Sequence, residues 1–298
     1  MKIAIVQNFD FLPYQVKKIK SLGDVEFYED ANSAEEWLER CQKADIVCSA
    51  SEFMETEVYK LKDKFFTIPM VGYSWLDIEK LKLNNIKLAN CPGCNKYAVS
   101  EWVIGMTLEL LRGFSKLTNT TVSENEIKQA VGLKGKSITI LGKGNIGQLV
   151  GKVFEDLGAK ITFFDKNDEL IEKTKNADII INSLSTNPST IGLLNNEFFE
   201  NLKKGSYFIS ITTTEIYDNK AMLEALDNGT LAGVATDCAS ASIRNTKDEY
   251  YQAISKHPRI LATPHIAWST DVSTQDENDM MIENIDAFIN GESKNIVA

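Results

Sequence analysis

The chain has 298 residues, a length that favours two domains over one. Its composition, 43% hydrophobic and 25% charged with six prolines, is that of a folded globular protein and excludes disordered, collagen-like and disulfide-rich classes. With 32 basic and 42 acidic residues the net charge is −10, so no attraction to nucleic acid or to anionic membranes is expected, and a small-molecule substrate is favoured.

The predicted elements alternate between short β-branched runs and segments of helical periodicity, the pattern of βαβ units on a parallel sheet. In the first third of the chain, strands are predicted at 2–6, 25–28, 45–49, 67–71 and 87–89. Helices are predicted between them at 14–22, 34–41, 55–61 and 77–83.

A long apolar segment without helix breakers follows at 99–111 and predicts a largely buried helix at a domain junction. A second alternation then begins, with strands predicted at 137–141, 160–164, 178–181, 207–211, 232–236 and 259–262 and a last helix at 272–289. The predicted fold class is therefore α/β, with two Rossmann-like domains, each a parallel sheet flanked by helices, and an active-site cleft between them.

Localisation is predicted from three features of the sequence. No apolar run approaches the roughly 18 residues of a membrane span, and the chain begins with strand-like sequence rather than a signal peptide. The five cysteines are scattered and odd in number, which is typical of reduced thiols in the cytoplasm. Cys91 and Cys94 form a C-x-x-C motif, but no second ligand pair accompanies it, so no metal site is expected.

A glycine-rich loop, Gly-Lys-Gly-Asn-Ile-Gly at 142–147, follows a predicted strand and opens a helix that runs to residue 157. In such loops the first glycine (Gly142) permits a tight turn, the second (Gly144) lets the backbone approach a pyrophosphate, and the third (Gly147) allows helix and strand to pack closely. Asp165 lies 18 residues after Gly147, at the end of the next predicted strand, which is the spacing of an acid that binds the ribose. These features predict NAD as the cofactor, the alternative being a glycine-rich turn without a ligand.

Several stretches of the chain resemble the D-2-hydroxyacid dehydrogenases. Beside the glycine loop these are VGYSWLD at 71–77, NCPGCN at 90–95, VSE at 99–101, GTLAGVATD at 229–237 and TPHIA at 263–267. The resemblance implies an NAD-binding Rossmann domain at residues 94–269 and a flavodoxin-like substrate domain made of residues 1–93 plus 270–298. It also implies a homodimer that forms through the coenzyme domain.

The resemblance also implies roles for single residues. His265 matches the histidine of the family that gives a proton to, or takes one from, the oxygen at which hydride transfer occurs. Contacts with the cofactor are implied for the glycine loop, including Asn145 and Ile146, and for Asp165, Thr212 and Asp237, the last of these near the nicotinamide amide. Contacts with the substrate are implied for Gly72, Tyr73, Thr213 and Ser242.

Two catalytic positions of the family differ in this chain. Thr213 stands where relatives carry the arginine that holds the substrate carboxylate, and Ser242 stands where they carry a glutamate that keeps the histidine charged. A neutral hydroxyl neither pairs with a carboxylate nor raises the pKa of His265. These replacements predict a poor reductase of 2-keto acids.

Further departures from the family pattern are Ser183 and Ser185, where histidine and proline are usual, and Trp102. Arg244 and Lys96 are alternative anion contacts, although a solvated surface charge is the more common role of such residues. Two functions remain open. One is an NAD-dependent oxidoreductase acting on a small hydroxy or keto compound with a histidine as acid/base, and the other is a catalytically impaired NAD(H)-binding protein that acts as a sensor or scaffold.

Overall fold

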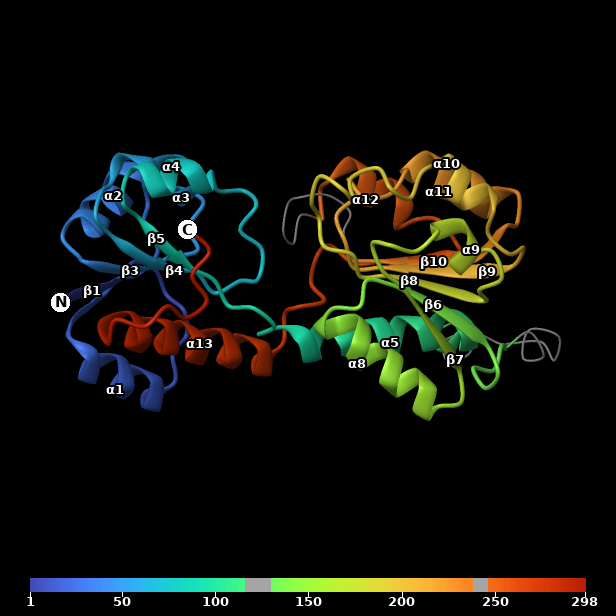
Figure 1. The fold of residues 1–298 in the computed structure, drawn as a ribbon, viewed down its shortest axis with the longest axis horizontal. Helices are drawn as coiled ribbons and strands as arrows, with labels where there is room; N and C mark the ends of the chain where they lie inside the picture. Colours follow the sequence, from blue (N-terminus) through green and yellow to red (C-terminus); the bar gives the residue numbers. More distant parts are fainter. Residues whose placement is uncertain (116–129, 238–245) are drawn as a thin grey trace. The chain divides into compact units, whose positions relative to one another are not determined.

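A computed structural model describes residues 1–115, 130–237 and 246–298. These residues form two compact units, unit 1 (Met1–Asn95 with Thr270–Ala298) and unit 2 (Lys96–Ser269). The sequence predicts domain boundaries between residues 93 and 94 and between residues 269 and 270. Each unit is a parallel sheet with helices on both faces (Figure 1), which confirms the predicted α/β fold class.

Unit 1 is built on five parallel strands in the order β2-β1-β3-β4-β5, the order of flavodoxin. The strands are β1 (Lys2–Ile5), β2 (Asp24–Phe27), β3 (Ile46–Cys48), β4 (Phe65–Thr67) and β5 (Lys87–Ala89). One face is covered by α1 (Pro13–Leu22) and α13 (Asp271–Ile289). The other face is covered by α2 (Ala34–Gln42), α3 (Met54–Glu57), the 3-10 turn η1 (Val58–Lys60) and α4 (Ile78–Leu83).

The fourth strand differs from the sequence prediction. The sequence predicts a strand at 67–71, whereas β4 ends at Thr67. The Ile68 N–H still donates to the carbonyl of Ala89 at 3.0 Å, but Pro69 has no N–H and cannot continue the ladder. The proline therefore ends the strand early and releases the following residues into a loop.

Unit 2 carries six parallel strands in the order β11-β10-β9-β8-β6-β7. The strands are β6 (Ser137–Leu141), β7 (Lys160–Phe164), β8 (Ile179–Asn182), β9 (Ser206–Ser210), β10 (Leu231–Thr236) and β11 (Ile260–Ala262). One face is covered by α5 (Lys96–Arg112) and α8 (Asn145–Asp156). The other face is covered by α9 (Leu170–Thr174), α10 (Asn196–Glu200), α11 (Asn219–Asp227) and α12 (Glu249–Ile254).

Local sequence explains why these elements form. The strands are continuous apolar runs because helices cover both faces of each sheet; in β8, for example, Ile179, Ile180 and Ile181 are all fully buried. Several helix starts carry side-chain caps, as where the Ser33 hydroxyl accepts from the backbone of Glu36 at the start of α2. None of the helices in the described ranges is long and apolar enough to cross a membrane.

Unit 1 buries a carboxyl group in its core. Glu277 of α13 is only 7% exposed, and its Oε1 accepts from the hydroxyl of Ser273 at 3.4 Å and from the thiol of Cys94 at 3.8 Å. Burial raises the pKa of Glu277 to about 7, against the weaker effect of these two bonds. The neutral form is therefore favoured in the folded protein well above the pH at which an exposed glutamate ionises.

We expect Glu277→Gln to raise the free energy of unfolding by about 3 kcal/mol at pH 8 and to change it little at pH 4. The folded-state pKa lies above the unfolded value, so the stability from the neutral carboxyl is present at low pH and is lost as the pH rises through 7. Urea unfolding at both pH values measures the difference. Glu283→Gln on the same helix is the control, because Glu283 is half-exposed and ion-paired with Lys294. An equal effect of Glu277→Gln at both pH values would contradict this expectation.

Candidate active site

Six loops of unit 2 leave the sheet at one edge, where the carboxyl ends of its parallel strands meet. Backbone hydrogen bonds continue the ladder from the strands into these loops. Written with the N–H donor first and the carbonyl acceptor second, they are Gly142 to Phe164 (3.2 Å), Ser183 to Leu141 (3.0 Å), Ile211 to Asn182 (3.2 Å), Asp237 to Ser210 (3.1 Å) and Thr263 to Thr236 (2.9 Å). The strand order reverses between β6 and β8. In open α/β sheets, ligands bind outside the carboxyl ends of the strands at such a reversal.

The glycine loop leaves β6 at this reversal. Gly142 has φ +97°, and a Cβ there would lie 2.9 Å from the carbonyl oxygen of Ser183. A Cβ on Gly147 would lie 2.2 Å from the carbonyl oxygen of Gly142, so only glycine fits at either position. At Gly144, in contrast, no heavy atom lies within 4 Å of the Cβ position. The loop is therefore tight against the protein at both ends and open in the middle.

The open middle of the loop is the start of α8. Gly144 is the N-cap residue and has no side chain with which to cap the helix, so it offers no partner to the first N–H groups, at Asn145 and Ile146. Those groups and the helix dipole attract anions. Asp165 lies exposed at the end of β7, next to β6, and its Oδ1 accepts from the backbone of Lys166 at 2.7 Å. An open glycine loop, an uncapped helix start and a nearby carboxylate together fit a dinucleotide.

Neutral polar side chains lie between the glycine loop and the next strands. The Ser183 hydroxyl donates to the carbonyl of Leu141 at 2.9 Å, beneath the glycine loop. The amide of Asn182 donates to the hydroxyl of Thr212 at 2.8 Å, and Thr212 is 6% exposed. These bonds tie the ends of β6, β8 and β9 together.

Thr213 pairs with another threonine. Its hydroxyl lies 2.9 Å from that of Thr186, and Thr213 is half-buried. Of the two other predicted cation sources, Lys96 begins α5 with its ammonium over the ring of Tyr97, 4.7 Å from its centroid, and Arg244 lies outside the described residues. Within the described ranges, the Thr213 position thus offers hydroxyls rather than a charge.

His265 sits in a turn that is held by Asp237. The carboxylate of Asp237 accepts from the hydroxyl of Thr263 at 2.5 Å and from the backbone N–H groups of Ile266 and Ala267 at 2.9 and 2.7 Å. The backbone N–H of His265 donates to the carbonyl of Asp237 at 2.6 Å. His265 has φ +55°, a left-handed conformation that costs energy in a residue other than glycine. The aspartate therefore fixes the histidine backbone from both sides.

Burial sets the electrostatics of this pair. It lowers the pKa of His265, against the attraction of the Asp237 carboxylate, and leaves the Nδ1 atom of His265 buried without a hydrogen-bond partner. Burial also raises the pKa of Asp237, and the bonds from Thr263 and the backbone N–H groups oppose this rise. The imidazole is therefore largely neutral near pH 7 and able to accept a proton.

The structure brings most of the predicted residues together. The glycine loop, Asp165, Thr212, Thr213, Asp237 and His265 all follow carboxyl ends of strands in unit 2. Gly72 and Tyr73 lie in unit 1, in the loop after β4, where the Tyr73 carbonyl accepts from the backbone of Leu76 at 3.0 Å. Their contact with a substrate stays a prediction. Ser242 lies outside the described residues.

Three residues of this edge were missed by sequence reasoning: Asn182, Thr186 and Thr263. Asn182 carried a signal, because it is a polar residue that ends a fully buried isoleucine run. Thr263 could be suspected from its place before the Pro-His pair. Thr186 carried no signal, since its partner Thr213 comes from another strand.

The part of the chain that forms this sheet edge matches a known protein family. Residues 104–267 match the model of the D-isomer specific 2-hydroxyacid dehydrogenase NAD binding domain, a match that spans the glycine loop and the His265 turn. The chain belongs to the D-2-hydroxyacid dehydrogenase family. It thus carries the NAD-binding domain of a family of oxidoreductases.

Relatives in this dehydrogenase family span nearly the whole chain. A glycerate dehydrogenase of Methylorubrum extorquens is 26% identical over 99% of this chain and 95% of its own length. A hydroxypyruvate reductase of Blautia hydrogenotrophica is 25% identical over 100% of this chain and 99% of its own length. Among solved structures, an acyclic imino acid reductase in complex with NADPH and D-Arg shares the fold at a TM-score of 0.84, with 22% identity and full coverage of both chains.

Other candidate features of this family member lie in unit 1. Cys91 and Cys94 are buried in the core beside Glu277, and burial raises the pKa of both thiols, to about 12 for Cys94. Among the residues that the structure describes, no group of three or more His, Cys, Asp or Glu side chains could hold a metal ion. The two thiols therefore pack as small apolar side chains.

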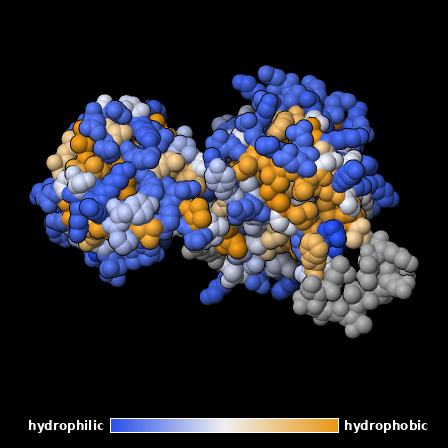
Figure 2. Space-filling view, turned by 90° about the horizontal axis from the view of Figure 1, so that it is seen from below, coloured by the Kyte–Doolittle hydropathy of each residue, from blue (hydrophilic) through white to orange (hydrophobic). Residues whose placement is uncertain are grey.

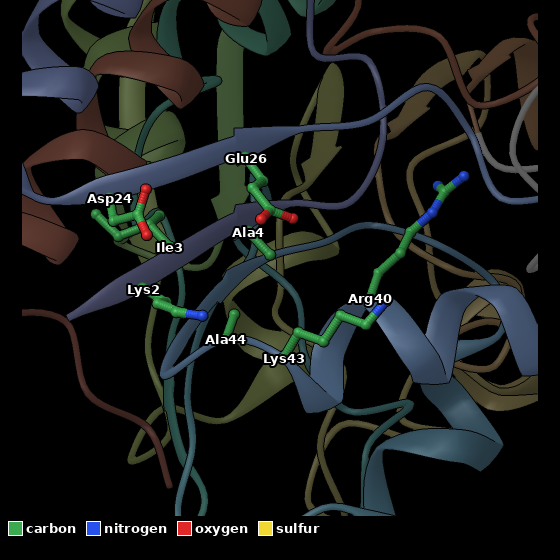
Figure 3. Close-up of a pocket in the computed structure, with 8 residues that line it drawn as sticks. All are labelled: Lys2, Ile3, Ala4, Asp24, Glu26, Arg40, Lys43 and Ala44. Atoms are coloured by element: carbon green, nitrogen blue, oxygen red, sulfur yellow. The ribbon is translucent and has the colours of Figure 1, made fainter.

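A small cavity opens at the amino-terminal ends of strands β1 and β2 in the unit 1 sheet (Figure 3). It is lined by Lys2, Ile3, Ala4, Asp24, Glu26, Arg40, Lys43 and Ala44. Its volume is about 10 Å³, room for a single water molecule at most. Neither its size nor its place suits a dinucleotide or a substrate.

Proposed function

We propose that this member of the family transfers hydride between a nicotinamide cofactor and a small hydroxy or keto compound, with His265 as the acid/base. The observation that carries the proposal is the His265 turn, held in a left-handed conformation by Asp237 on the same sheet edge as the glycine loop. Backbone strain of this kind persists only where the surrounding structure holds it, and it is typical of functional sites.

The cofactor would be held by the sheet edge of unit 2. Gly142, Gly144 and Gly147 shape the loop, and the backbone N–H groups of Asn145 and Ile146 would bind the pyrophosphate. We assign Asp165 to the ribose and Thr212 and Asp237 to the nicotinamide end. When bound, the nicotinamide supplies or accepts the hydride.

His265 would move the proton that accompanies the hydride. In the oxidation direction the substrate hydroxyl gives its proton to the neutral imidazole, and in the reduction direction the imidazolium returns a proton to the carbonyl oxygen. The lowered pKa of His265 keeps the neutral form abundant at pH 7. Gly72, Tyr73, Thr213 and Ser242 are our proposed substrate contacts.

We expect the protein to bind NADH at least tenfold more tightly than NADPH, because the carboxylate of Asp165 accepts hydrogen bonds from a ribose hydroxyl but repels a 2′-phosphate. Nucleotide fluorescence titration measures both affinities. Asp165→Ser is expected to reduce the preference for NADH over NADPH. Asp156 is an exposed carboxylate of α8, and Asp156→Asn is expected to leave this preference unchanged. Equal or tighter binding of NADPH by the parent protein would overturn the assignment of Asp165.

A second candidate function is an NAD(H)-binding sensor or scaffold that has lost catalysis. The neutral Thr213–Thr186 pair favours it, because the family resemblance implies an arginine at the Thr213 position. The Asp237-held turn of His265 favours the enzyme. Hydride transfer itself distinguishes the two functions, since both bind the cofactor.

We also propose a homodimer that forms through unit 2. Figure 2 shows hydrophobic residues gathered on the side of this unit where α5 and α8 lie. Ile104, Met106 and Leu110 of α5 are partly buried rather than fully covered, and no heavy atom lies within 4 Å of the Cβ position of Gly105 on the same helix. Sedimentation at micromolar concentration is expected to give a species of twice the 33.3 kDa chain mass, and a monomer would contradict the proposal.

A cytoplasmic location is the last part of the proposal. Cys41, Cys48, Cys91 and Cys94 are all free and buried in unit 1. Reduced buried thiols are typical of proteins that work in a reducing compartment.

A further inference from the structure

We propose that Trp102 of α5 is a positioning residue for His265, acting through Thr263 and Asp237. The inference rests on the acid/base role of His265 in the proposed function. It concerns a side chain that the sequence marks only as a departure from the family pattern.

The connection is a continuous chain of hydrogen bonds within unit 2. The indole Nε1 of Trp102 donates to the hydroxyl oxygen of Thr263 at 3.1 Å. The Thr263 hydroxyl in turn donates to Oδ1 of Asp237 at 2.5 Å. Because the indole N–H can only donate, it occupies a lone pair of the Thr263 oxygen and leaves the hydroxyl proton for the carboxylate. Trp102 thereby sets the direction of the Thr263 hydroxyl.

The carboxylate at the end of this chain holds the turn. Besides Thr263, it accepts from the backbone N–H groups of Ile266 and Ala267, the two residues after His265. Asp237 is 2% exposed, so each donor matters for keeping it ionised and in place. The indole of Trp268 donates to the His265 carbonyl at 3.1 Å on the far side of the turn. The strained histidine backbone is thus anchored to both α5 and its own loop.

Two consequences follow from a loss of the indole N–H. The Thr263 hydroxyl becomes free to rotate, so its bond to Asp237 weakens and the turn loosens. The negative charge of Asp237 also becomes less well stabilised. Because this charge attracts the imidazolium and opposes the effect of burial, its loss lowers the pKa of His265 further. Trp102→Phe removes the donor and keeps an aromatic ring of smaller volume at this position.

The experiment compares Trp102→Phe, Thr263→Val and the double variant in steady-state hydride transfer. We expect kcat to fall about 2- to 10-fold for Trp102→Phe and about 10- to 100-fold for Thr263→Val, with KM within about twofold of the parent. The double variant is expected to match Thr263→Val alone, because Trp102 acts only through Thr263. Thr263→Ser, which keeps the hydroxyl, is expected to restore kcat to near the parent value.

A readout independent of turnover is the titration of His265 by NMR, with His257→Asn used to assign the two imidazole signals. Both Trp102→Phe and Thr263→Val are expected to move the His265 titration to lower pH. Trp37→Phe is the matched control, since Trp37 donates to Ser49 at 3.0 Å in the core of unit 1. It is expected to change neither kcat nor the titration.

Independent losses in kcat that multiply in the double variant, with the His265 titration unchanged, would overturn the role of Trp102. A titration that shifts as expected in a protein without any hydride transfer would leave the inference about the turn intact and would instead contradict the proposed function. If Trp102→Phe strongly lowers the melting temperature, the comparison of Thr263→Val with Thr263→Ser replaces it. A lower kcat and a shifted His265 titration in Thr263→Val alone would then support the proposed chain of hydrogen bonds, and equal values in both variants would overturn it.

Discussion

Replacing His265 by asparagine is expected to lower kcat for hydride transfer about 10²- to 10⁴-fold, because the proton that accompanies the hydride loses its donor and acceptor. NADH affinity is expected to stay within a few-fold of the parent, since no cofactor contact is assigned to the imidazole. The measurement is steady-state turnover of the best substrate of a panel, together with NADH fluorescence titration.

The other histidine provides the control. His257 accepts a hydrogen bond from the backbone of Arg259 at 3.2 Å, at the amino-terminal end of β11 and away from the candidate site. His257→Asn is expected to keep full turnover. A loss of turnover in His265→Asn of less than threefold would contradict the acid/base assignment.

The direction of the pH dependence follows from the lowered pKa of His265. Oxidation needs the neutral imidazole, so its rate is expected to be level above pH 7 and to fall only in more acidic solution. Reduction needs the imidazolium, so its rate is expected to rise as the pH falls below the ordinary histidine value of about 6.5. Both profiles are expected to lose this dependence in His265→Asn.

The second large effect concerns substrate choice. We expect kcat/KM of the parent for pyruvate, glyoxylate and hydroxypyruvate to lie well below ~10⁴ M⁻¹s⁻¹, the low end for competent enzymes. Thr213 lies beside Thr186, and neither hydroxyl gives a substrate carboxylate the charged, bidentate partner that an arginine gives. A hydrogen bond to a charged group contributes about 1.5–3 kcal/mol, or one to two decades in rate.

The double variant Thr213→Arg, Ser242→Glu is expected to raise kcat/KM for these keto acids at least tenfold over the parent. Asn201→Arg is the matched control for added charge, since Asn201 is exposed at the end of α10. NADH oxidation over the keto acid panel measures all three proteins. Turnover of any of the three acids by the parent at or above ~10⁴ M⁻¹s⁻¹ would show that another group holds the carboxylate, or that Thr213 is not the position of the family arginine.

Much of the fold could be predicted because its signals are local. Strands β6 and β7 begin and end where the apolar runs do, and the glycine loop between β6 and α8 has a fixed spacing. The helices between β7 and β11, namely α9, α10, α11 and α12, were not located individually from the sequence. Strand β4 was predicted at 67–71 because the residues on either side of Pro69 are apolar. The prediction did not take into account that proline lacks the N–H needed to continue a strand.

The candidate site could be predicted by residue but not by contact. Sequence reasoning singled out His265, Asp237 and Thr213 from their motifs. It could not foresee that Trp102 bonds to Thr263, or that the Asp237 carboxylate holds the histidine turn, because these bonds join residues from separate strands and a helix. Side-chain partners of this kind are set by packing, which a single sequence does not display.

The most direct test of the central claim is deuteride transfer. The protein is incubated with NADH deuterated at the nicotinamide C4 and a panel of small keto, aldehyde and keto acid compounds, and the products are analysed by mass spectrometry. We predict deuterium on the reduced carbon of at least one product with the parent protein and a loss of about 100-fold or more in its rate of formation with His265→Asn. Binding of NADH without deuterium transfer to any compound, or equal transfer by both proteins, would contradict it.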